Sequence, residues 1–328
     1  MALSGALSLA DAAKLSQDDL QRGVLETFVQ ESSVLDRIPF MTIQGNAYAY
    51  NEESTMPGVA FRAVNDAYAG SVGTVVQKSE SLCILGGDAD VDRFIVQTRG
   101  NLNDQRAIQT RMKVKAASYF YQDQFINGSK AANANGFDGL KVRLTGAQVI
   151  PADTNGAPII GGTDNAASYT FFDLLDALVA QVDGLSAGNG ALYANRAVIA
   201  KVLSAGRRIG GVDQVREDLT GKRVVTWNGI PILDLGQTTA GVDILPQTET
   251  QGTSVNTSSI YAVKFGASEG DRAVTGLTNG GVQVYDLGEL DSQPVYRTRL
   301  EFYTGLATFG GKAAARLTGV LTGAAQTA

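Results

Sequence analysis

The chain of 328 residues carries a formal net charge of −6, contains no histidine and has 18% charged residues. Without histidine it lacks the side chain most often used for acid–base chemistry near neutral pH, for metal binding and for activating a serine nucleophile. We therefore expect a protein that is not an enzyme and has no cofactor or metal. The negative charge disfavours contact with DNA phosphates over the whole surface, so any such contact would be local.

Cysteine usage and the N-terminus indicate where the protein is made. The lone thiol, Cys83, cannot form an intramolecular disulfide, which is typical of a reducing cytoplasm. The first basic residue is Lys14, so no basic region precedes an apolar stretch and no secretory signal is expected. The most apolar window, Phe171 to Leu185, contains three aspartates, which disfavour a membrane-spanning helix. Glycine makes up 38 of the 328 residues, a larger share than the usual ~7%. Such a composition suits many turns and close backbone contacts, as in an assembly.

The first forty residues have the pattern of an arm. Ser8 to Asp11 has the spacing of a capping box ahead of a short helix. A second amphipathic helix follows, with Leu20, Val24, Leu25 and Phe28 on one side. Both helices are predicted to end before Pro39. Because the segment has few apolar residues, we expect it to lie outside the core.

A long excursion follows from Phe40. Tyr48 and Tyr50 alternate with small residues as in a half-buried strand, and the next strand pattern is Ser81 to Leu85. The intervening segment is rich in turn formers, yet it carries the apolar residues Met56, Val59, Phe61 and Tyr68. It is either a disordered surface loop or a projecting hairpin whose apolar residues are buried by a neighbouring subunit, because an isolated hairpin is only marginally stable.

Asp88, Asp90 and Asp92 resemble the start of a calcium-binding loop. The pattern fails because Arg93 occupies the glycine position and Arg99 occupies the twelfth position, where glutamate is required. On a strand the three aspartates share one face. We predict an acidic stripe that is solvated or faces a partner.

A long helix is predicted from about Asn103 to Asn127, ended by Gly128. Its apolar face is expected to carry six residues at helical spacing, namely Ile108, Met112, Ala116, Tyr119, Phe120 and Ile126. Its other faces carry Arg106, Arg111, Lys113 and Lys115. One interpretation of these four cations is an ordinary solvated face.

The second half of the chain alternates helices and strands without a regular βαβ repeat, which predicts an α+β fold. Residues 133–164 are loop-like and mark a domain crossover. Thr170 to Asp173 is a second capping box for a helix that ends at Gly184, and Asn195 is the predicted N-cap of a helix over 197–205. Asn228 and Gly229 predict a hairpin turn. Strands are expected at 191–194, 223–227, 230–233, 260–263, 282–285, 295–303 and 314–320, with a loop at 247–259.

No nucleotide-binding or catalytic motif is present. There is no G-x-G-x-x-G, and Gly305 to Lys312 misses the P-loop pattern because six residues separate its ends and Ala313 follows the lysine. We therefore predict no catalytic, cofactor-binding or metal-binding residues. A soluble enzyme that uses carboxylate or lysine chemistry is the alternative from another class, and it would be a monomer with a deep pocket.

Several segments resemble one family in their order and spacing. Arg22 to Glu26, Val34 to Phe40, Gly45 to Tyr48 and Met56 to Arg62 resemble the N-terminal third of tailed-bacteriophage major capsid proteins with the Hong Kong 97-type fold. Leu192 to Asn195 and Trp227 to Ile232 resemble the central domain of the same family. The resemblance spans almost the whole chain.

The resemblance implies a division of the chain and a function. The implied parts are an N-terminal arm at 1–40, an extended β-hairpin loop at 41–86, an axial domain at 167–275, and a peripheral domain made of 87–166, with the long helix at about 103–127, and 276–328. The implied function is that of a viral structural protein whose copies self-assemble into pentamers and hexamers. These form the icosahedral shell of the virion around double-stranded DNA, after assembly in the host bacterial cytoplasm.

The resemblance also implies partners. The loop residues Met56, Val59, Phe61 and Tyr68 would contact a neighbouring copy, and Arg106, Arg111, Lys113 and Lys115 would form a stripe that meets packaged DNA weakly and non-specifically. Because the arm begins within a few residues of Met1, a separate scaffold, or none, is implied. The resemblance also implies a portal and decoration proteins as partners, and no membrane. No lysine lies between Met41 and Gln77, so no lysine–asparagine crosslink is expected there. A nanocompartment shell of the same fold, which encloses an enzyme, is the closest alternative.

Overall fold

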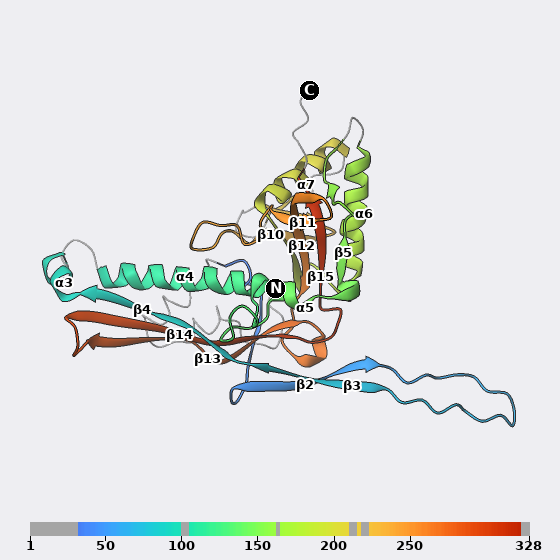
Figure 1. The fold of residues 1–328 in the computed structure, drawn as a ribbon, viewed down its shortest axis with the longest axis horizontal. Coiled ribbons are helices and arrows are strands. Elements are labelled where there is room, and N and C mark those ends of the chain that lie inside the picture. Colours follow the sequence, from blue (N-terminus) through green and yellow to red (C-terminus); the bar gives the residue numbers. More distant parts are fainter. Residues whose placement is uncertain (1–31, 100–104, 162–164, 210–214, 218–222, 323–328) are drawn as a thin grey trace.

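Two β-sheets, each covered by helices, organise the computed structural model of the chain (Figure 1). The structure describes residues 32–99, 105–161, 165–209, 215–217 and 223–322. The two helices predicted before residue 31 lie outside the described residues. Mixed helices and strands without a βαβ repeat confirm the α+β class.

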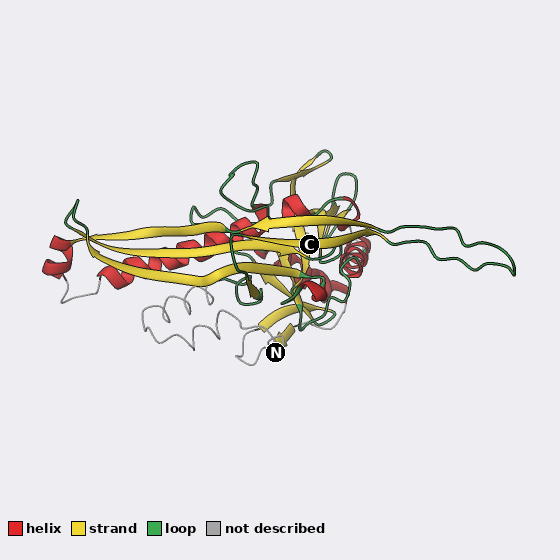
Figure 2. Cartoon of the chain, turned by 90° about the horizontal axis from the view of Figure 1, so that it is seen from below, coloured by secondary structure: helices red, strands yellow, loops and turns green. Residues whose placement is uncertain are grey.

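The first sheet has the strand order β1-β13-β14-β4. Its strands are β1 (Phe40–Thr42), β13 (Val274–Glu289), β14 (Val295–Thr308) and β4 (Cys83–Asp92). β1 runs parallel to β13, and the other neighbours are antiparallel. The long helix α4 (Gln105–Asn127) lies along one face of this sheet (Figures 1 and 2). Buried and outward-facing side chains therefore alternate along β14. Leu300 and Phe302 are buried beneath the helix, while Arg297 and Arg299 face outward.

The predicted helix is confirmed, but of the six residues predicted for its apolar face only Ile126 is buried. Ile108, Met112 and Phe120 are 41%, 60% and 46% exposed. The side that packs on the sheets is interrupted by polar residues and consists of Thr110, Val114, Ser118, Tyr121, Gln122, Phe125 and Ile126. Small hydroxyl residues are tolerated there because they can satisfy themselves locally, as when Ser118 Oγ donates to the Lys115 carbonyl at 2.8 Å. An apolar-periodicity search does not count such positions.

The second sheet has the order β5-β15-β12-β7-β10-β9-β8, with β11 beside β12 and β6 beside β15. Residues of β7 (Gly190–Ala194) are all buried. Leu192 and Ala194 belong to the same apolar cluster as α6 (Ala166–Ala180) and α7 (Arg196–Ile209). Tyr193 points to the opposite face, with its ring 6.4 Å from that of Phe125 in α4. The other strands are β5 (Val149–Pro151), β6 (Ala157–Pro158), β8 (Val215–Glu217), β9 (Arg223–Trp227), β10 (Ile230–Asp234), β11 (Glu249–Gln251), β12 (Ser254–Lys264) and β15 (Ala314–Leu321).

Two local predictions for the part of the chain that forms the second sheet are confirmed. Asn195 Oδ1 accepts a hydrogen bond from the Ala197 backbone N–H at 2.8 Å, as an N-cap does. Asn228 and Gly229 have φ values of 49° and 81° and join β9 to the antiparallel β10. Positive φ at both central residues defines the type I′ hairpin turn that Asn-Gly favours.

Three other predictions are wrong. α6 begins at Ala166 and not at Thr170, whose hydroxyl instead donates to the Ala166 carbonyl one turn earlier. The loop predicted at 247–259 is largely the antiparallel pair of β11 and β12. β15 pairs with β12, β5 and β6, so the C-terminal strand joins the second sheet and not the sheet of α4, where the expected division placed residues 276–328. Its partners are far away in sequence, so no local pattern reveals them.

The remaining described elements connect or extend these two units. They are α3 (Arg93–Arg99), α5 (Leu140–Arg143), the 3₁₀ turns η1 (Gly146–Gln148) and η2 (Glu269–Asp271), and the antiparallel pair of β2 (Ala47–Thr55) and β3 (Thr74–Ser81). In the described part of the chain, no helix is long and apolar enough to cross a membrane.

Candidate assembly surfaces

The base of the β2–β3 hairpin is fixed to the body of the molecule. The Tyr50 hydroxyl donates to the Thr308 carbonyl at 3.1 Å, and its ring packs edge-on against Phe309 with centroids 4.9 Å apart. Burial raises the pKa of Tyr50 to about 12. The neighbouring Tyr48 hydroxyl donates to Glu269 at 3.2 Å. These contacts define the direction in which the hairpin leaves the sheet.

The tip of the hairpin, residues 56–73, leaves its large apolar side chains largely exposed. Strand pairing ends at Thr55 and Thr74, whose hydroxyl oxygens lie 2.6 Å apart. Beyond that pair the chain projects away from both sheets (Figures 1 and 2). The four predicted contact residues are exposed, with Met56 at 75%, Val59 at 98%, Phe61 at 108% and Tyr68 at 68%. A projecting hairpin, and not a loop folded onto the body, is therefore what the chain forms.

The tip nevertheless has an ordered path. The Ser71 hydroxyl donates to the Gly58 carbonyl at 2.8 Å across the two arms. The Arg62 guanidinium lies 5.1 Å from the centre of the Tyr68 ring. Val64 and Val72, which the sequence prediction missed, are 90% and 89% exposed on the same tip. The alternation of large apolar residues with Ala and Gly was the signal that could have found them.

The four basic residues of α4 do not form one stripe. Arg106 Nη2 lies 2.6 Å from Asp286 Oδ1 of β13, and Lys113 lies against Gly87 of β4. Arg111 and Lys115 are exposed instead. Seven residues separate the first pair and four the second, so each pair lies on its own side of the helix. The four cations therefore do not form the single stripe that was one of the two interpretations, because Arg106 and Lys113 lie against the first sheet.

The acidic stripe of β4 is also different from the prediction. Asp88 and Asp90 do share one face, but arginines of the adjacent β14 bind them. Arg299 donates to Asp88 through Nε and Nη2 at 2.8 and 2.9 Å. Arg297 donates to Asp90 in the same forked manner at 2.7 and 2.6 Å. The stripe is thus a ladder of cross-strand ion pairs, a third possibility beside the solvated and partner-facing alternatives.

These ion pairs predict a dependence of stability on acid. The hydrogen bonds from Arg299 and Arg297 lower the pKa values of Asp88 and Asp90. A lowered folded-state pKa contributes stability above the unfolded value of about 4, and that stability is lost as the pH falls through the folded values. We expect the melting temperature of the chain to fall more steeply below about pH 4 than that of an Asp88→Asn/Asp90→Asn variant. Parallel curves in thermal melts at successive pH values would contradict this.

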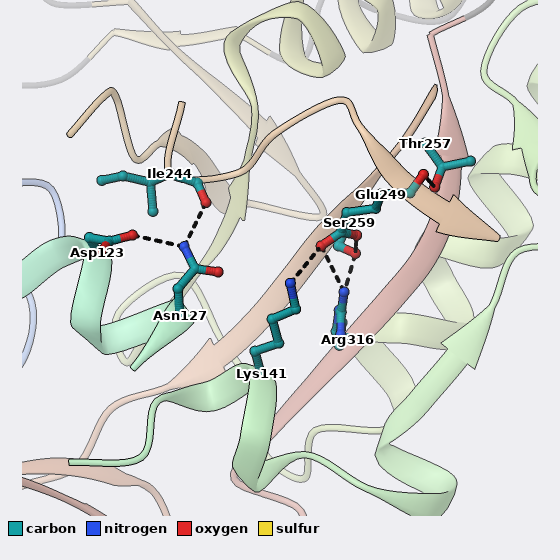
Figure 3. Close-up of polar contacts among 8 residues, drawn as sticks. All are labelled: Asp123, Asn127, Lys141, Ile244, Glu249, Thr257, Ser259 and Arg316. Carbon is teal, nitrogen blue, oxygen red and sulfur yellow. Dashed lines mark hydrogen bonds and ion pairs between the residues drawn. The ribbon is translucent and has the colours of Figure 1, made fainter. Parts of the chain in front are cut away.

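A polar junction around α5 joins the base of the hairpin to the second sheet. Arg143 of α5 binds the Glu80 carboxylate of β3 through two nitrogens, at 2.5 and 2.8 Å, and its Nε donates to the Asp138 carbonyl. Two residues earlier in α5, Lys141 lies 3.6 Å from Glu249, which also binds Arg316 at 2.8 Å and the Ser259 hydroxyl (Figure 3). Asn127, at the end of α4, donates to the Ile244 carbonyl at 2.9 Å. The one turn of α5 therefore contacts both the hairpin and the second sheet. No sequence pattern linked these residues.

The hollow beside the hairpin base has a volume of about 840 Å³ and is lined by β2 and the loops at 264–272 and 309–312. Its charged groups mostly shape those loops. Lys264 Nζ donates to the Asp271 carbonyl, and Asp271 Oδ2 accepts from the backbone of Ala267 and Ser268. In the described ranges, no three His, Cys, Asp or Glu side chains are grouped as metal ligands.

Solved structures of capsids and of an encapsulin complex share the fold of this chain. The chain is similar to the holo-SrpI encapsulin complex of Synechococcus elongatus PCC 7942, with 18% identity and a TM-score of 0.64 over 100% of this chain and 99% of that one. It is similar to the capsid of a native GTA particle, with 12% identity and a TM-score of 0.62 over 89% of this chain and 91% of that one. It is also similar to Microbacterium phage Oxtober96, with 12% identity and a TM-score of 0.55 over 96% of this chain and 99% of that one. The fold of the chain is therefore of the Hong Kong 97 type.

Part of the sequence also matches a family model. The model of the family described as major capsid protein GP7 matches residues 16–170, which include the hairpin, α4 and the α5 junction. No curated protein matches the chain. This match covers a little under half of the chain and agrees with the family that the sequence resemblance indicated.

Proposed function

We propose that copies of this chain close into pentamers and hexamers, and that these rings form an icosahedral shell around double-stranded DNA. The observation that carries the proposal is the hairpin tip, where the side chains of Met56, Val59, Phe61 and Val64 are at least 75% exposed. A protruding element that binds a different surface of the next copy makes a heterologous contact, and such contacts generate closed rings. The virion capsid is then the location of the protein, after assembly in the bacterial cytoplasm.

The proposed role of the tip is to cover a neighbour. Burying Met56, Val59, Phe61 and Tyr68 would stabilise each contact by roughly 1.5–3 kcal/mol per fully buried side chain. The junction of Glu80 and Arg143 supports this role because it fixes the base from which the tip projects. Obligate interfaces of this kind usually bury about 2,000 Å² or more, which the tip can supply only together with other surfaces.

The direct test is to purify the recombinant chain and to examine it by sedimentation and negative-stain electron microscopy. Closed particles with five-fold vertices are expected. A chain that stays monomeric at all concentrations would contradict the proposal and favour the soluble-enzyme alternative. Scaffold, portal and decoration proteins remain proposed partners, and co-expression with a scaffold belongs in the test where the chain alone gives irregular assemblies.

A cellular nanocompartment is a second candidate function. The observation that favours it is the similarity to an encapsulin complex over the whole length of this chain. The two candidates differ in what the shell holds. Particles isolated from the natural host should contain nuclease-protected DNA if the chain is a viral capsid protein, and a protein cargo without DNA if it forms a compartment.

We further propose that Arg111 and Lys115 contact packaged DNA, with Arg106 and Lys113 contributing less because Arg106 is paired with Asp286 and Lys113 packs beside Gly87. Replacing Arg111 and Lys115 by glutamine should reduce the DNA retained by particles and the salt dependence of that retention, since each lost phosphate contact lowers the salt slope by roughly 1. The matched control replaces Arg106 and Lys113 by glutamine. Equal DNA retention in all three proteins, measured after nuclease and salt washes, would leave only a solvated face.

A further inference from the structure

One side of α4 carries large apolar residues that face away from the sheets. Ile108, Met112 and Phe120 are 41%, 60% and 46% exposed, and the half-buried Ala116 lies between the last two. Residues four apart are neighbours on a helix surface, so these four form one row, called here the α4 stripe. A contiguous exposed apolar patch of this kind marks a contact surface.

The N-terminal arm leads into a segment that is already docked on α4. Gln122 Nε2 donates to the Ser33 hydroxyl oxygen at 3.1 Å. Val34 and Leu35 are buried in the same apolar cluster as the C-terminal part of α4. Gln122 follows Phe120, the last residue of the α4 stripe, by only two positions. The residues before Ser32 therefore begin beside the C-terminal end of the stripe.

Residues 16–31, which lie outside the described ranges, have an apolar pattern that matches the stripe. The sequence predicts a helix there with four apolar residues on one side, namely Leu20, Val24, Leu25 and Phe28. Leu20, Val24 and Phe28 repeat every four residues, as the first three members of the stripe do. At 1.5 Å per residue, a helix from 20 to 31 spans about 17 Å, and α4 between Ile108 and Gln122 spans about 21 Å. The arm is thus long enough to cover most of the stripe.

The arm and α4 also have complementary charge. Residues 16–31 contain one basic residue, Arg22, and four acidic residues, Asp18, Asp19, Glu26 and Glu31. α4, with the sequence QRAIQTRMKVKAASYFYQDQFIN, has four basic residues and one acidic residue. Complementary charge steers two surfaces together and fixes their register. Arg111 and Lys115 lie about 100° and 60° round the helix from Met112, so an arm on the stripe lies beside these two cations.

From these observations we propose that residues 16–31 pack as a helix on the α4 stripe of the same copy. Phe28 lies toward the C-terminal end of the stripe and Leu20 toward its N-terminal end. The connection fixes this direction, because Phe28 is only five residues from Ser33, which is held at Gln122. The contact forms within one copy, so it does not depend on the proposed function, and a chain that forms no shells would still show it.

Disulfide trapping in the full chain tests the contact. The background variant is Cys83→Ala, which removes the single cysteine. Met112→Cys is added together with either Val24→Cys or Leu25→Cys, because a disulfide forms only between residues whose Cα atoms come within about 7 Å. At least one pair should give an intramolecular disulfide under mild oxidation, identified as a linked peptide by mass spectrometry. The matched control joins Val24→Cys with Asp173→Cys, an exposed position on α6, and should give none.

Two results of this experiment would overturn the proposal. The first is the absence of a linked peptide from both Met112→Cys pairs. The second is a disulfide that joins two different chains, seen as a dimer on a non-reducing gel, because the arm would then belong to a neighbouring copy.

Thermal melting decides the question if the cysteine variants fail to fold. Met112→Ser should lower the melting temperature of the wild-type chain by about 2 °C, because it removes an apolar contact with the arm. The same substitution should have no effect in a chain whose Leu20, Val24, Leu25 and Phe28 are all replaced by serine. In the matched control, with Gln21→Ser and Gln30→Ser, the effect of Met112→Ser should persist. Equal shifts with the wild-type arm and with the four-serine arm would overturn the proposal.

Discussion

A chain without its hairpin tip is expected to fold normally and to form no closed shells. Strand pairing ends at Thr55 and Thr74, so residues 56–73 can be replaced by Asn-Gly, the two-residue turn that favours a hairpin. The tip buries no large side chain on its own body, and Met56, Val59 and Phe61 are at least 75% exposed. The melting temperature of the isolated subunit should therefore change little, while closure of shells should be lost.

Two further variants distinguish lost apolar contact from lost length. Replacing Met56, Val59, Phe61 and Tyr68 by serine retains the length of the tip and should still prevent most shells from closing. Replacing Ala60 and Ala63 by serine is the matched control, which removes no large side chain and should leave shells intact. Particle yield by sedimentation and electron microscopy is the measurement. Normal shells from the shortened chain would show that the tip does not join neighbours.

Elements that are determined locally could be predicted from the sequence. The type I′ turn at Asn228 and Gly229, the cap at Asn195 and the end of α4 at Asn127 each depend on a few adjacent residues. The hairpin tip was predictable for a different reason. Exposed apolar residues among turn formers conflict with burial on the same chain, and that conflict indicates a partner.

Features that depend on distant pairing could not be predicted. The β4 stripe has the sequence of a solvated surface, but Arg297 lies 207 residues after Asp90 and meets it only through the register of β14 and β4. The core side of α4 is similar, because Thr110 and Ser118 are buried by a sheet whose strands lie elsewhere in the sequence. In both cases the pairing of distant strands determines which residues meet, and the local sequence around each residue does not indicate its partner.

The Glu80–Arg143 pair could not be predicted either, because its members are 63 residues apart in the sequence. Breaking this pair should have the second large effect that we expect. The side chains of Arg143 and Glu80 are only 13% and 11% exposed. Arg143→Met would leave the Glu80 carboxylate buried with only Lys130, 4.0 Å away, and should lower the free energy of unfolding by about 3–5 kcal/mol. The hairpin would also lose its fixed base, so assembly should fail below the temperature at which the subunit melts.

Urea denaturation at neutral pH measures this effect, and the chain offers a matched control. Lys78 binds Glu52 on the same hairpin, but its side chain is 47% exposed, so Lys78→Met should cost at most about 1 kcal/mol. Adding Glu80→Gln to Arg143→Met removes the unpaired charge and should recover part of the loss, because most of the penalty comes from the remaining buried carboxylate. If Arg143→Met destabilises the subunit no more than Lys78→Met does, the junction does not hold the hairpin, and the direction of the hairpin must depend on the contacts of Tyr48, Tyr50 and Phe309.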